Sequence, residues 1–513
     1  MAKKNISNRN NSVKKVKKIK KKIVTKRGNS KILRKTIRPV SIKKKDITNL
    51  RYAMIHSRVG DRDGVSIVMK QIEDVMHDEL NIPRSNILYL VGKSKLNSNR
   101  VFKHRILYDS TKLRKLTEKK FKVGFGGTIS EDVEKAIQKA QQVITKFFKT
   151  KKIDVLIAHN TCHPVNFILS VALSRYYRDS IKKRERTPKY LLWWHDSHLE
   201  RKVFSNPAKD VERYLLQGVP GDNVEYIFFI NSTQYGVSQK YFEKLDGRFP
   251  GYSKIIYKNH DVIYNTTDTY IDSYDDLETD KFSYRVEKFI SDYNIYSFLK
   301  KKNKSLKDVI FCLQHTRMVD RKRIDFALEY VFKLLDVVNK RRVNKKLLYF
   351  LISGHDNGST RKKIVKKYRS LCKVYGCDLV HLEFAEDHDG KTDICFEEYP
   401  RLIAKLRGFS TYFSEIEGFG NNLLEVLASG LIPVVYEYPV FKTDISKYKF
   451  KLISLDKYEV NMESITKLIK LLNNDRQRKI WANRNLEILR KRLPHRIIAK
   501  KLVRGIIRKR VHI

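Results

Sequence analysis

The sequence has little cysteine and no long apolar run. Its five cysteines among 513 residues are odd in number and include no Cys-x-x-Cys pair, which argues against a disulfide scaffold and a zinc site. No apolar segment approaches the roughly 18 residues that a membrane-spanning helix needs, and the basic N-terminus lacks the apolar stretch of a secretory signal. These absences predict a cytoplasmic protein and leave open a peripheral position at a virion or a membrane.

Acidic residues are almost missing from the two ends of the chain. The net charge is +51; residues 1–45 hold 19 Lys and Arg and no acid, and residues 476–513 hold 14, with Glu487 as the single acid. Such ends attract polyanions, so nucleic acid, an anionic membrane or an acidic glycan is expected as an electrostatic partner. The alternative is a solvated tail without a partner.

The motifs of P-loop NTPases (Gly-x4-Gly-Lys-Ser/Thr) and zinc proteases (His-Glu-x-x-His) are also absent. What is present is an alternation of short apolar runs with helical stretches, which begins near Tyr52 and starts again at Val309 after an acidic stretch. It predicts an α/β protein with two Rossmann-like, doubly wound domains facing across a crevice. The predicted units are a basic disordered tail at 1–46, an N-terminal domain with linker at 47–300, a C-terminal domain at 301–475 and a basic helical segment at 476–513.

The segment from Ser414 to Val435 carries the most informative local pattern. It has the order strand, glycine loop, helix and strand. Gly418 and Gly420 allow a ligand to approach the backbone closely, and a helix that opens at Asn421 or Asn422 presents free N–H groups to phosphate or sugar oxygens. The segment therefore predicts a ligand site at the start of a helix.

Two glutamates, Glu417 and Glu425, lie eight residues apart in this segment. If both were helical, they would be separated by roughly 12 Å along the axis and rotated by about 80°. The paired carboxylates of a retaining glycosidase must lie about 5 Å apart, so this spacing does not suit them. It suits the two ends of an elongated ligand, such as a nucleotide sugar.

The pattern Glu-Gly-Phe-Gly, followed by Leu-Glu-x-x-Ala-x-Gly and Pro-Val-Val, resembles the donor-site motif of retaining GT-B glycosyltransferases of family four, the group that includes sucrose synthase. The resemblance implies that Glu417 contacts the transferred sugar and Glu425 the ribose of a nucleoside-diphosphate sugar. The first domain would then lie on the acceptor side, and the second would bind the donor. Backbone groups implied to line the sugar and diphosphate site belong to Gly418, Phe419, Gly420 and Asn421.

A second basic segment, Thr316–Asp325, follows the first predicted strand of the C-terminal domain and resembles the family's Arg…Lys-Gly segment. The resemblance implies that Arg317 and Lys322 neutralise the diphosphate, where negative charge grows as the glycosidic bond breaks. Arg321 could substitute for either cation. The sequence departs from the family at Arg323, where glycine is usual, so the loop is open to a different shape.

Two segments of the first domain also match the family. Gly60 and Gly64 resemble its N-terminal glycine loop, which implies contact with donor phosphates or acceptor; an ordinary strand-to-helix turn is the alternative. His195 and Asp196 follow a buried strand and resemble a His-Asp pair that lines the donor sugar. A structural histidine after a strand is the alternative there.

The resemblance implies a hexosyltransferase that moves a sugar, with retention of configuration, to a hydroxyl of an unknown glycan, lipid or protein acceptor. We expect no metal and no cofactor besides the donor, because the pairs Asp61-x-Asp63 and Asp387-x-Asp389 are too short to define a metal site and GT-B enzymes stabilise the leaving group without one. The competing hypothesis is a catalytically weak GT-B body that binds nucleic acid or a virion through its basic ends.

Overall fold

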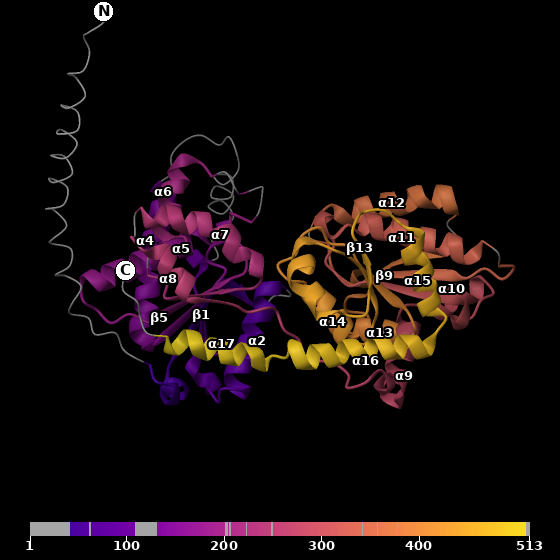
Figure 1. Ribbon diagram of the computed structural model, residues 1–513, viewed down its shortest axis with the longest axis horizontal. Helices are drawn as coiled ribbons and strands as arrows, with labels where there is room; N and C mark the ends of the chain where they lie inside the picture. The colour runs from indigo at the N-terminus through magenta and orange to yellow at the C-terminus, as the bar shows by residue number, and fades with distance from the viewer. Residues whose placement is uncertain are drawn as a thin grey trace, which may run out of the picture.

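The structure is a computed structural model that describes residues 42–60, 63–107, 131–200, 204, 207–221, 223–247, 250–340, 342–356, 358–376 and 378–508. Figure 1 shows two lobes, each a sheet flanked by helices, with the last two helices running along one side of both. Residues 1–41 of the disordered tail predicted at 1–46 lie outside the described residues. Its last residues belong to a 3-10 helix, Lys44–Asn49, and the carbonyl of Ile47 accepts a hydrogen bond from the Tyr52 hydroxyl at 2.7 Å.

The first sheet has seven parallel strands in the order β3-β2-β1-β4-β5-β6-β7. Its strands are β1 (Tyr52–Val59), β2 (Ile87–Ser94), β3 (Val101–Lys103), β4 (Val155–His159), β5 (Lys189–Trp194), β6 (Tyr226–Phe229) and β7 (His260–Val262). Its helices are α2 (Gly64–Asp78), α4 (Glu131–Lys151), α5 (Phe167–Lys182), α6 (Lys209–Gly218), α7 (Ser232–Asp246) and α8 (Tyr252–Lys258).

The second sheet has six parallel strands in the order β10-β9-β8-β11-β12-β13. Its strands are β8 (Val309–Gln314), β9 (Leu347–Ile352), β10 (Val380–Phe384), β11 (Phe409–Tyr412), β12 (Pro433–Tyr436) and β13 (Ile453–Leu455). The helices around it are α9 (Asp280–Asp292), α10 (Ile295–Lys301), α11 (Ile324–Asn339), α12 (Thr360–Tyr375), α13 (Tyr399–Lys405), α14 (Asn421–Ala428), α15 (Met462–Leu472) and α16 (Asp475–Arg492).

The strands are apolar on both faces because helices cover both faces. In β1, Ala53 and Ile55 belong to one core cluster, and Tyr52 and Met54 belong to the cluster on the other side. This is the alternation expected of a pleated strand that is buried on both faces, as in a doubly wound sheet. The predicted fold class, two Rossmann-like domains, is confirmed.

Packing places the start of the second domain earlier than the predicted boundary at residue 301. Apolar residues of α9 and α10, among them Phe289, Ile290 and Leu299, share a core with Phe311 and Leu313 of β8. The two helices therefore belong to the second domain, although the sequence placed them with the first. The acidic stretch before them forms the connection.

The basic C-terminal segment is helical and divides between the two domains. Helix α16 packs on the second domain, whereas α17 (Arg496–Ile507) returns to the first and contributes Ile498, Leu502 and Ile506 to its core. Part of its charge is used inside the fold: Arg504 pairs with Asp261 at 3.0 Å. Within the described part of the chain, no helix is both long and apolar enough to cross a membrane.

Candidate functional site

The loops that follow β5 and β6 of the first sheet meet the loop that follows β11 of the second. Asn231 Nδ2 donates to the carbonyl of Gly418 at 2.7 Å, and the backbone N–H of Ser232 donates to Asp444 Oδ2 at 2.9 Å. A Cβ on Gly418 would lie only 2.9 Å from the side chain of Ile230. The carboxyl edges of both sheets therefore face each other, which is where open α/β sheets bind ligands.

Glu417 is the buried anion on the second-domain side of this region. Lys322 Nζ donates to its Oε1, and Arg321 donates to its Oε2 at 3.2 Å. Burial alone would raise the pKa of Glu417, but Lys322 and Arg321 outweigh it and hold the pKa at about 2. The carboxylate is thus ionised at neutral pH and shared by two cations.

The chain conformation around Lys322 accommodates Arg323 at the position where the sequence resemblance predicts glycine. Arg323 has φ +48°, the left-handed region that glycine adopts most easily. Its guanidinium is held by Asp325 at 3.0 Å and by Glu415 at 3.2 Å, and it lies over the ring of Tyr458. Local ion pairs therefore stabilise the turn that glycine would form without strain.

Arg317 differs from its two basic neighbours because its side chain is exposed and makes no hydrogen bond or ion pair with the described residues. Partial desolvation at the crevice and the nearby charge of Arg321 lower its pKa, while Asp63 of the first domain and Glu417 oppose this. Arg317 is therefore a cation near both domains that pairs with no anion among the described residues.

The glycine loop after β11 packs closely against side chains of the fold. Gly420 has φ +123°, and a Cβ there would lie 2.4 Å from the Tyr438 hydroxyl. Asn421 begins α14 and accepts a hydrogen bond from Asn265 of the first domain. The side chain of Phe419 lies in the core and stacks on Tyr264 at 5.2 Å, so this side chain is not available to a ligand.

Glu425 lies on α14, apart from the cluster around Glu417. Its Oε2 is 3.2 Å from His315 Nε2 and accepts from Asn422 Nδ2 at 3.1 Å. His315 is itself fixed by Ser353 Oγ at 2.9 Å from its Nδ1. Because Glu417 precedes the helix, the all-helical estimate of the spacing does not describe the two glutamates. They nevertheless occupy separate environments, one with Lys and Arg and one with His and Asn.

On the first-domain side, His195 directly follows β5 and belongs to a group of buried histidines with His56, which lies within β1, and His159, the last residue of β4. His159 Nδ1 lies 3.3 Å from His195 Nε2, and His56 Nδ1 donates to the carbonyl of His159 at 3.0 Å. Burial lowers the pKa of His195 to about 3, and burial lowers that of His56 to about 4. These imidazoles are neutral at neutral pH, so they can donate to or accept from ligand hydroxyls without adding charge.

A carboxyl and an amide hold the His195–Asp196 turn. Gln234 Nε2 donates to the carbonyl of His195 at 2.8 Å and to Glu200 at 2.7 Å. Burial raises the pKa of Glu200 to about 7. The backbone N–H of Asp196 donates to Asn160 Oδ1 at 3.1 Å. The turn is therefore fixed by side chains that approach it from two neighbouring loops.

The two glycines of the predicted loop in the first domain lie directly after β1 and at the first residue of α2. Gly60 has φ +80° and packs against Leu96, and Asp63 caps α2 by accepting from the N–H of Val65 at 3.1 Å. A Cβ on Gly64 would meet nothing within 4 Å, so that glycine leaves open space rather than filling a close contact. Asp61, half of the predicted acidic pair, lies outside the described residues.

The second acidic pair is engaged in ion pairs, Asp387 with Arg361 and Asp389 with His355. Within the described ranges, no group of three His, Cys, Asp or Glu side chains is arranged to hold a metal ion. Sequence reasoning missed His315 and Gln234, whose amide holds the carbonyl of His195. A polar residue directly after a strand was the available signal for His315, whereas Gln234 lies 39 residues from His195 in sequence.

Comparison with solved structures defines the class of fold. A structure titled trehalose-6-phosphate from E. coli bound with UDP-2-fluoro glucose matches with a TM-score of 0.56 and 9% identity, covering 90% of this chain and 100% of that one. WaaG, a glycosyltransferase involved in lipopolysaccharide biosynthesis, matches with a TM-score of 0.50 and 11% identity, covering 89% and 99%. The chain has the GT-B fold.

Sequence comparison extends this to two relatives of one name. The chain is 25% identical over 445 residues to the mannosylglucosylglycerate synthase of Petrotoga mobilis, covering 82% of this chain and 91% of the relative. It is 32% identical over 155 residues to the synthase of the same name from Thermotoga maritima, covering 28% of this chain and 34% of the relative. No family model matches the chain. Fold and sequence likeness together support a glycosyltransferase of the GT-B fold.

Proposed function

We propose that the protein transfers a sugar from a nucleoside-diphosphate sugar to an acceptor hydroxyl with retention of configuration. The observation that carries the proposal is the ionised, buried Glu417, held by Lys322 and Arg321 at the start of the glycine loop. A carboxylate fixed in this way can accept hydrogen bonds from sugar hydroxyls. Its two cations, together with the unengaged Arg317, place positive charge beside the expected position of the diphosphate.

The proposed chemistry needs charge stabilisation at the leaving group. The bond between the anomeric carbon and the diphosphate oxygen breaks, and its electron pair stays on that oxygen. The acceptor oxygen forms a bond to the anomeric carbon on the same face, and its proton passes to the leaving phosphate. Arg317, Arg321 and Lys322 would stabilise the growing negative charge, so the proposal requires neither a metal nor a covalent nucleophile.

The second glutamate supports an elongated donor. Glu425, on α14, contacts Asn422 of the same helix and His315, which follows β8. Its carboxylate can accept hydrogen bonds from ribose hydroxyls. The structural relative bound to UDP-2-fluoro glucose supports a nucleoside-diphosphate sugar as the donor class for this fold. His195 and Asp196, opposite the glycine loop, would then contact the transferred sugar.

Two measurements test the proposal. A panel of nucleoside diphosphates and their sugars should include members that raise the unfolding temperature, because a ligand that binds only the folded state stabilises it by mass action. The nucleotide sugar that stabilises the protein is then incubated with candidate acceptors, and the product is examined by NMR. The anomeric configuration of the transferred sugar in the product should be the same as in the donor. Inversion would overturn the retaining mechanism. Failure of every nucleotide to stabilise the protein, with no donor turnover, would overturn the function.

A further inference from the structure

The amino edge of the second sheet carries a surface that the crevice does not use. It consists of residues 296–307 before β8, residues 342–346 before β9 and residues 373–376 before β10, which we call the amino-edge face. Three side-chain contacts join its segments to one another and to the start of β10: Lys304 to Asn344, Lys346 to the carbonyl of Lys307, and Lys302 to Asp378 at 3.0 Å. The segments therefore form one continuous surface.

This face lies at the opposite end of the sheet from the crevice. Strand β8 begins at the face and ends just before His315, and its six residues span roughly 20 Å at about 3.3 Å per residue. In Figure 1, α10 lies on the side of the second lobe that points away from the first lobe. A partner on this face would leave the crevice open.

Six cations on the face have no partner among the described residues. Their side chains are exposed and make no hydrogen bond or ion pair there; they are Lys300, Lys301, Lys307, Arg342, Lys345 and Lys373. The nearby acids are already engaged, Asp378 by Lys302 and Asp308 by the backbone and hydroxyl of Ser305. The face therefore presents positive charge that nothing within the fold neutralises.

Apolar side chains stand among these cations. Val343 is 104% exposed and Val374 is 73% exposed, the two highest values among the large apolar residues of the described chain. Tyr296 and Tyr375 on the same face are also exposed. Aliphatic side chains in full contact with water are unfavourable, so the arrangement favours a partner that has both anionic groups and an apolar interior.

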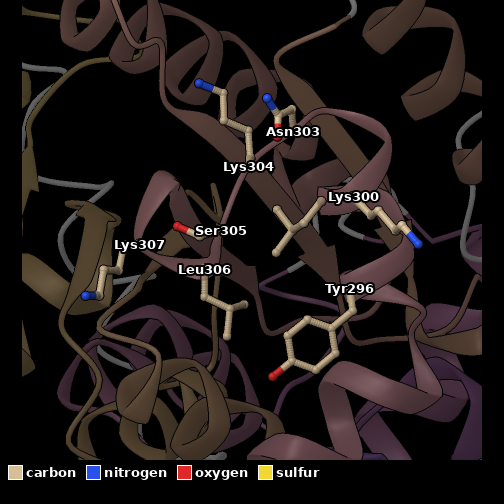
Figure 2. A pocket seen from close by; sticks show the side chains of 8 residues that line it. Tyr296, Lys300, Asn303, Lys304, Ser305, Leu306 and Lys307 are labelled. Atoms are coloured by element: carbon tan, nitrogen blue, oxygen red, sulfur yellow. The ribbon is translucent and has the colours of Figure 1, made fainter.

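Between the cations lies an open recess of about 660 Å³. Figure 2 shows Lys300, Lys304 and Lys307 on different sides of it, with their amino groups spread outward, and Tyr296 beside Leu306. Because the amino groups diverge, they do not enclose one small anion. They suit several anionic groups distributed over a surface.

We propose that the amino-edge face docks on an anionic lipid surface. The cations would lie among the lipid phosphates and carboxylates, Val343 and Val374 would enter the interface, and the tyrosines would lie at headgroup level. A nucleic acid could neutralise the cations, but it offers no apolar layer to the two valines. The inference is independent of the proposed glycosyl transfer, because it concerns the other end of the domain.

Vesicle binding of the full chain tests the charged part of the face. We compare vesicles of phosphatidylcholine alone with an equal mixture of phosphatidylcholine and phosphatidylserine. The triple variant R342S/K345S/K373S should lower the partition coefficient on the mixed vesicles by at least ~10-fold, since each cation near an anionic membrane contributes measurably. The matched control K457S/K470S/R476S removes the same charge from exposed positions elsewhere in the second domain and should bind as the wild type does.

The apolar part has its own test, without a change of charge. V343S/V374S should weaken binding to the mixed vesicles about threefold, and the emission of V343W should shift to the blue on these vesicles. The control M462W, at another exposed position, should not shift. Equal loss of vesicle binding in both triple variants would overturn the assignment to this face. Loss of duplex RNA or DNA binding in R342S/K345S/K373S, with vesicle binding unchanged in V343S/V374S, would overturn the lipid assignment.

Discussion

The wall that the first domain contributes to the crevice contains neutral imidazoles, whereas the wall of the second domain contains charges. Burial holds the pKa of His195 at about 3, so the ring carries no charge at neutral pH. Glu417 is equally enclosed, yet its pKa is about 2 because Lys322 and Arg321 contact it directly. Burial thus removes charge where no partner is present and preserves it where ion pairs form. Under the proposed function, the neutral first wall would contact sugar hydroxyls only, whereas the charged second wall would contact the diphosphate as well as hydroxyls.

The largest effect should come from removing the charge of the second wall with Glu417→Gln. This leaves Lys322 buried without its partner, so we expect a loss of roughly 3–5 kcal/mol in the free energy of unfolding. Transfer should fall by roughly 1000-fold. Denaturant unfolding and donor turnover measure the two effects, and Glu417→Asp separates loss of charge from failure to fold. Glu415→Gln, which alters the pairing of the half-buried Arg323, is the control and should change both quantities little.

Arg317→Ala should separate catalysis from stability within the same wall. Arg317 is exposed and pairs with no anion in the described part of the chain, so its removal should leave the unfolding temperature unchanged. It should lower kcat/KM by roughly 100-fold if the guanidinium stabilises the leaving diphosphate. Arg369→Ala, an exposed cation of α12, is the matched control for activity. Unchanged kcat/KM in the Arg317 variant would remove this residue from the proposed mechanism.

Glu425→Ala sharpens the comparison between the two ends of the donor. Loss of a charged acceptor of ribose hydroxyls should weaken donor binding by about 10–100-fold. The effect should be similar for the nucleoside diphosphate and for its sugar, since both contain the ribose. Calorimetric titration of both ligands measures it. Normal affinity for both would contradict the ribose assignment.

The smallest effect concerns pH and the first wall. A histidine whose folded pKa is depressed stabilises the fold fully above its unfolded value of about 6.5, and this contribution is lost as the pH falls toward the folded value. For His195, with a folded pKa of about 3, the loss at pH 5.5 is about 1.4 kcal/mol. His195→Asn should therefore lose about that much less stability than the wild type between pH 7.5 and 5.5. Equal losses, measured by denaturant unfolding, would contradict a buried neutral imidazole.

Much of the fold could be predicted because its signals are local. Continuous apolar strands, the glycine loop and the order of the elements all lie within short segments, and they predicted two doubly wound domains. The partners of those segments could not be predicted in the same way. Arg321 and Glu417 are 96 residues apart, and their contact depends on two loops meeting at one sheet edge. The packing of α17 on the first domain was not predicted, because the segment is strongly basic. The signal for it was the recurrence of Ile498, Leu502 and Ile506 at helical spacing.

That return has a mechanical consequence. The chain passes between the domains twice, once before α9 and once between α16 and α17. The two passages lie side by side: Thr266 Oγ1 is 2.6 Å from His495 Nδ1, and the N–H of Thr267 donates to the carbonyl of Leu493 at 3.1 Å. Two adjacent tethers restrict twisting and sliding more than bending. A rotation of one domain against the other would therefore have to bend both passages together at this doubled connection.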